Sequence, residues 1–85
     1  MNIYRETFEG SLGGPIRAKS LETLLKRKGV REFLHECLLE ESDKWGQNTN
    51  NTGPFPEAKR REALQQWYID NLEVLDEKTG GWKRA

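Results

Sequence analysis

The 85-residue sequence predicts a mainly α fold, a small three-helix domain preceded by an extended N-terminal arm or short strand. Apolar residues recur at helical spacing through most of residues 20–78. Residues typical of helix ends stand at the borders of these segments. A run of Gly, Asn, Thr and Pro separates the two longest segments. A chain of this length has room for one core, so residues 1–85 are expected to form a single helical domain.

Residues 1–19 are expected to form the arm and a turn. Strand-favouring side chains are followed by several glycines and a proline: Ile3, Tyr4, Thr7 and Phe8, then Gly10, Gly13, Gly14 and Pro15. Because a lone strand is unstable, the arm must pair with residues 16–19 in a hairpin, pair with another chain, or lie across the helices. We expect the third arrangement.

The first two helices are predicted at about 20–28 and 30–45. Ser20 is a good N-cap, and Gly29 is expected to stop the first helix. The second helix carries one apolar face formed by Val30, Phe33, Leu34, Cys37, Leu38 and Trp45. Glu41 falls inside that face, where a carboxylate needs a cationic or backbone donor, so we predict a structural ion pair.

Residues 46–55 are predicted to form a loop, and the third helix is predicted at about 56–78. Pro56 suits a first helical position, and Gly80 is expected to be the stop signal before a tail at 79–85. The apolar stripe of this helix spans about half its circumference. Its members are Ala63, Leu64, Trp67, Tyr68, Leu72, Val74 and Leu75.

Charge and composition exclude several classes of protein. Lys and Arg number 14, as do Asp and Glu, so no net charge draws the chain to nucleic acid or an anionic membrane. The sequence contains no apolar run long enough to cross a bilayer and no signal segment. Cys37 is the single cysteine, which excludes an internal disulfide. A cytoplasmic location is therefore expected.

No set of residues in the sequence suits catalysis or metal binding. His35 and Cys37 are two positions apart, so on a helix they point to different sides, and there is no second His or Cys. The glycine-rich stretch 10–14 lacks the spacing of a nucleotide-binding loop. We expect no enzymatic activity and no cofactor.

Two apolar residues break the helical pattern and mark a candidate surface. Leu39 lies among Glu32, Glu36 and Asp43, and Ile69 lies among Glu62, Glu73 and Asp76. Either the N-terminal arm covers one of them, or both are centres of a contact surface with an acidic rim. The preferred hypothesis is a non-enzymatic protein-binding module, a regulator, adaptor or inhibitor that occludes a partner's surface. Phage-type inhibitors with acidic faces that mimic nucleic acid belong to this class, and a homodimer is left open.

The alternative hypothesis is a DNA-binding transcriptional regulator that uses the basic helix–Gly–helix segment 17–45. Six cations would contact phosphates: Arg17, Lys19, Lys26, Arg27, Lys28 and Arg31. The helix that would enter the major groove is acidic, and phosphate would repel it. Protein binding is therefore preferred.

Overall fold

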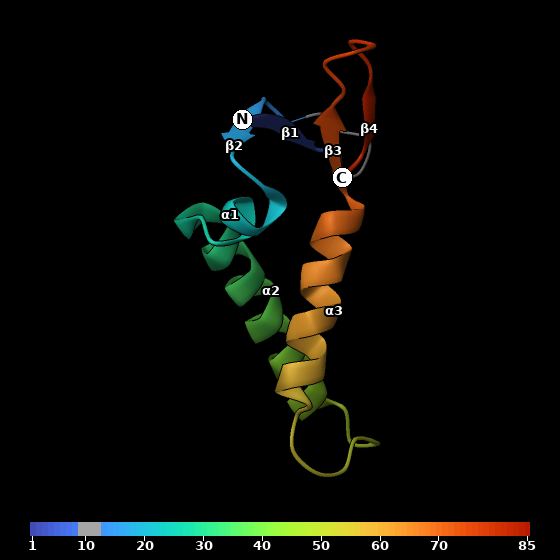
Figure 1. Ribbon diagram of the computed structural model, residues 1–85. Coiled ribbons are helices and arrows are strands. Elements are labelled where there is room, and N and C mark those ends of the chain that lie inside the picture. The colour runs from blue at the N-terminus through green and yellow to red at the C-terminus, as the bar shows by residue number, and fades with distance from the viewer. Residues whose placement is uncertain (9–12) are drawn as a thin grey trace.

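The computed structural model describes residues 1–8 and 13–85 and has a mixed α/β architecture. A four-stranded antiparallel sheet with strand order β2-β1-β3-β4 lies at one end of two long helices (Figure 1). The prediction of a mainly α three-helix domain is therefore wrong. The prediction allowed a short strand in the arm but did not expect a sheet. The C-terminal part of the third predicted helix and the predicted tail at 79–85 both contribute strands to this sheet.

The N-terminal arm forms a central strand of the sheet. Strand β1 (Asn2–Glu6) pairs with β2 (Ile16–Ala18) on one side and with β3 (Leu72–Leu75) on the other. The arm therefore pairs with residues 16–18 in a hairpin, and the expectation that it lies across the helices is wrong. The physical reason for this pairing is burial of Tyr4. Pairing of β1 on both sides places the Tyr4 ring in the core, where it is only 4% exposed.

The third predicted helix ends eight residues early. Helix α3 (Glu57–Asp70) stops at Asn71, whose side-chain amide donates to the carbonyl of Trp67 at 2.8 Å. This bond satisfies a carbonyl at the helix end, and the chain then continues as β3. Gly80, expected to stop the helix, has φ +71° in the turn between β3 and β4 (Trp82–Arg84).

The first two helices are shifted relative to the prediction. Helix α1 (Leu21–Leu25) begins after Ser20, whose hydroxyl accepts from the backbone N–H of Thr23, as the sequence predicts. Helix α2 (Lys28–Gln47) begins one residue before Gly29, so this glycine belongs to its first turn and does not end α1. The break between the helices falls at Arg27, which is extended at φ −64° and ψ 143°.

The core lies where one face of the sheet meets the helices. Tyr4, Ala18 and Leu72 from the strands pack with Leu24, Val30 and Tyr68 from the helices. Beyond this core, α2 and α3 run side by side away from the sheet, and residues 48–56 join their far ends (Figure 1). The molecule measures 52 × 24 × 17 Å, so much of the helix pair is covered by neither sheet nor α1.

Within the described residues, no helix has both the length and the apolar character that crossing a membrane requires.

Candidate protein-binding site

Three aromatic side chains from three parts of the chain meet at the surface. Phe8 follows β1, Phe33 lies on α2, and Trp67 lies on α3, with ring centroids separated by 5.0 to 6.0 Å. Phe33 is 38% exposed and Trp67 is 40% exposed. We call these three residues the aromatic patch.

Tyr68 packs against the patch from the core side. It is fully buried, its ring lies 5.7 Å from that of Phe8, and its hydroxyl donates to the carboxylate of Glu6 at 2.5 Å. Burial and the Glu6 carboxylate raise the pKa of Tyr68, so its hydroxyl stays protonated. Thr7 donates through its backbone N–H and its hydroxyl to the carbonyl of Asn71. These bonds tie the end of β1 to the end of α3 and hold Phe8 beside Trp67.

Carboxylates border the patch on α2. Cys37 lies one helical turn after Phe33, and burial together with the neighbouring Glu40, Glu41 and Glu36 raises the pKa of its thiol. The thiol therefore stays protonated and is a poor nucleophile. Glu36 and Glu40 are exposed, and neither makes an ion pair within the described residues.

The ion pair predicted for Glu41 is confirmed. Arg60 of α3 donates to both carboxylate oxygens of Glu41, at 2.8 and 2.7 Å. Hydrogen bonding and the Arg60 charge lower the pKa of Glu41. This bidentate bond links α2 to α3 beyond the core, and it removes Glu41 from the set of carboxylates available to a partner.

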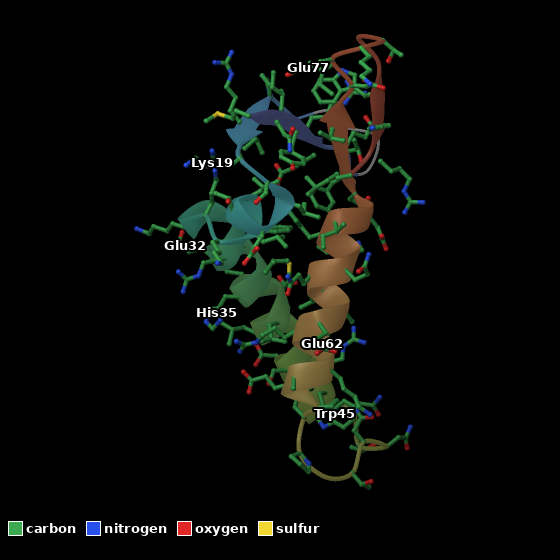
Figure 2. All side chains as sticks on the ribbon, in the orientation of Figure 1. Lys19, Glu32, His35, Trp45, Glu62 and Glu77 are labelled. Atoms are coloured by element: carbon green, nitrogen blue, oxygen red, sulfur yellow. The ribbon has the colours of Figure 1, made fainter. Side chains whose placement is uncertain are left out.

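Only part of the predicted acidic surface forms one face. Leu39 is 52% exposed, and it shares the outer side of α2 with three exposed acidic residues, Glu32, Glu36 and Asp43. On α3, Ile69 is half-buried and Glu62 is exposed. In Figure 2, Glu32 and Glu62 project from different helices.

The other two acidic residues predicted around Ile69 lie beyond the end of α3, in β3 and in the turn that follows it. Glu73 belongs to β3 and forms an ion pair with Arg5 at 2.6 Å. Asp76 accepts from the backbone of Lys78 in the β3–β4 turn. A helical acidic face around Ile69 is therefore absent, because the helix that would have presented it ends at Asp70.

The six cations of the alternative hypothesis lie in and around β2, α1 and the start of α2. Two are engaged by neighbours one turn away, with Lys26 bound to Glu22 and Lys28 bound to Glu32. Arg27 donates to the backbone carbonyl of Arg17, while Lys19 and Arg31 are exposed. Because α1 has only five residues and α2 is acidic beyond its first turns, this is a poor match to a helix-turn-helix. DNA binding stays a prediction.

Phe33 and Trp67 belong to apolar stripes whose side chains are expected to face the core, and their exposure at the surface differs from that expectation. A signal was present, because a stripe spanning about half a helix is wider than one neighbouring helix covers. Among residues 1–8 and 13–85, no three His, Cys, Asp or Glu side chains lie together as metal ligands. Comparison with known protein families, curated proteins and solved structures finds no match.

Proposed function

We propose that this chain is a non-enzymatic protein-binding module that acts in the cytoplasm as a regulator, adaptor or inhibitor. The observation that carries the proposal is the aromatic patch, in which Phe33 and Trp67 remain about two-fifths exposed. Aromatic residues are enriched at the centres of protein interfaces and dominate their binding energy. A small domain has little reason to leave two such rings beside its core unless a partner covers them.

The rings are well placed before binding. Phe33 and Trp67 stack at 6.0 Å with planes 24° apart, and Phe8 lies against both. Side chains that are already held by their neighbours lose less conformational entropy when a partner arrives. We therefore expect Trp67 and Phe33 to act as binding hot spots, whose loss costs at least about 2 kcal/mol each.

The patch has an acidic border that favours a basic partner surface. Glu36 and Glu40 are exposed beside it, and the exposed stripe continues on α2 to Asp43 and Leu39. Charges at an interface rim steer association and suppress wrong partners more than they add affinity. An inhibitor that occupies a basic nucleic-acid channel, as phage-type inhibitors do, is one form of this function.

The test is affinity capture from host-cell lysate with three tagged proteins: the wild type, Trp67→Ala and a control, Glu77→Ala. Glu77 is exposed in the β3–β4 turn, away from the patch (Figure 2). A partner protein is expected with the wild type and the control and is expected to be absent with Trp67→Ala, while circular dichroism verifies equal helicity. Recovery of the same proteins with all three would refute the aromatic patch as the contact centre.

The exposed stripe of α2 is tested separately with Leu39→Asp. If the interface extends along α2, this variant keeps its thermal stability and loses the same partner as Trp67→Ala. Retention of the partner would confine the interface to the patch.

A further inference from the structure

A groove between the helices forms a second surface feature that the proposed function does not use. It has a volume of about 710 Å³, within the range of about 300 to 1,000 Å³ usual for ligand pockets. Its floor is made of leucines from all three helices, and Figure 1 shows α2 and α3 diverging toward the sheet. These leucines are Leu25, Leu34, Leu38 and Leu64.

The groove and the aromatic patch lie on different sides of α2. His35 lines the groove, whereas Phe33 belongs to the patch. At about 100° per residue, two positions along a helix differ by about 160° in direction. None of the three patch residues lines the groove, so the patch and the groove can be occupied independently. Of the acidic residues beside Leu39 on α2, Glu32 alone also lines the groove.

Cations border the leucine floor on both sides. Lys26, Lys28 and Arg31 stand along α1 and α2, and Arg61 stands on α3. The acidic residues of the lining are Glu22 and Glu32, which leaves two positive charges in excess. The ion pairs of Lys26, Lys28 and Arg61 are all (i, i+4) contacts between exposed side chains. Such pairs are weak and screened by salt, so these cations remain available to an anionic ligand.

We infer that this groove docks an acidic amphipathic helix of a partner protein. An amphipathic helix fills an apolar trough with residues at i, i+3, i+4 and i+7, and its flanking carboxylates would meet the cations on both sides. Duplex DNA offers phosphates but no apolar ridge for a leucine floor. An anionic lipid has a single head group and would meet the cations on one side only.

A second copy of this chain is a poorer occupant. Its acidic stripe on α2 presents Leu39 as the one large apolar residue among Glu32, Glu36 and Asp43. Its aromatic patch adds exposed Phe33 on α2 and Trp67 on α3. These two residues and Leu39 do not stand at the i, i+3, i+4 and i+7 spacing of one helix face that would fill a floor made by four leucines. Three of the six basic residues that suggested phosphate contacts, Lys26, Lys28 and Arg31, are thereby assigned to the rim of a protein-binding groove. The chain then has two separate contact surfaces, as an adaptor requires.

The experiment measures fluorescence anisotropy of two labelled amphipathic peptides titrated with the full-length chain. Both peptides carry the same leucine stripe and differ only in having Glu or Lys at the flanking positions. The Glu peptide is expected to bind, more weakly at high salt, and the Lys peptide is expected to bind at least about tenfold more weakly.

Two variants locate the binding site. Arg31→Glu reverses an exposed rim charge and is expected to weaken the Glu peptide by about tenfold or more, with unchanged circular dichroism. Trp67→Ala is expected to leave the peptide affinity unchanged, so failure of the groove and failure of the aromatic patch give different results.

Four results would overturn the inference: no binding of the Glu peptide, equal binding of both peptides, unchanged affinity in Arg31→Glu, or loss of affinity in Trp67→Ala. Self-association in sedimentation that Arg31→Glu abolishes would also overturn it, because the groove would then hold a second copy.

Discussion

The hydrogen bond between Tyr68 and Glu6 joins the end of α3 to the central strand, and Tyr68→Phe removes it while keeping the ring. The ring would still pack on Phe8, and the core volume changes by one oxygen atom. The substitution removes the hydroxyl that donates to the Glu6 carboxylate at 2.5 Å, and Tyr68 is fully buried. The partly buried Glu6 carboxylate would then lack that donor.

Hydrogen bonds to charged groups contribute about 1.5 to 3 kcal/mol to stability. We therefore expect Tyr68→Phe to lower the free energy of unfolding by about 2 kcal/mol. For a domain of this size each kcal/mol shifts the melting temperature by roughly 4 to 8 °C, so Tm should fall by roughly 8 to 16 °C.

Thermal melts followed by circular dichroism measure the effect, and Tyr4→Phe is the matched control. Tyr4 is also buried, but the one hydrogen bond of its hydroxyl within residues 1–8 and 13–85 is accepted from the Asn2 side-chain amide at 3.2 Å. Loss of this neutral bond should cost at most about 1 kcal/mol. A double-mutant cycle with Glu6→Gln isolates the pair. Equal shifts for the two tyrosine variants would refute the special contribution of the Glu6 bond.

Three further predictions follow from local contacts and charges. Because Arg60 lowers the pKa of Glu41, this pair stabilises the fold fully above the ordinary carboxyl pKa. Its contribution is lost as pH falls through the lowered value, so Glu41→Gln should reduce Tm at neutral pH and little in strong acid. Equal reductions at both pH values would contradict this linkage. Gly80→Ala should destabilise the β3–β4 turn by about 1 kcal/mol, since φ +71° strains an L-residue, and denaturant unfolding measures the loss; an unchanged midpoint would contradict it. Titration with random duplex DNA should show no salt-dependent binding, and a steep salt slope would instead support the DNA-binding hypothesis.

The parts of the fold that depend on local sequence could be predicted. Ser20 caps α1, and the loop between the long helices separates two helical segments. The Glu41 pair was predictable because a carboxylate inside an apolar stripe needs a donor nearby, and Arg60 supplies it. Each of these features is set by residues close together in the chain or by one side chain's requirement.

The sheet could not be predicted in the same way. Leu72, Val74 and Leu75 fit the helical stripe of α3, and no local signal outweighs that period except Asn71, a poor helix former. What makes these residues a strand is β1, whose Arg5 pairs with Glu73 across 68 positions. The periodicity of apolar residues depends on neighbours a few positions away in the chain, so it cannot indicate pairing between residues far apart in the sequence. The aromatic patch was missed for a related reason, since its three rings come from three separate segments.

The pairing of β1 with β3 also has a consequence for how the chain acquires its structure. Strand β1 is synthesised before β3, and Glu73 is added 68 positions after Arg5, with which it pairs. Closing so long a loop costs conformational entropy before the sheet contacts form and offset that cost. Folding is therefore slower than for a helical bundle of equal length. During translation the α2–α3 pair can form while one edge of β1 still lacks its partner, and an open strand edge invites pairing with other chains. The newly made chain is therefore most exposed to aggregation until Leu75 has been released, and a nascent chain stalled before that point should be the better chaperone substrate.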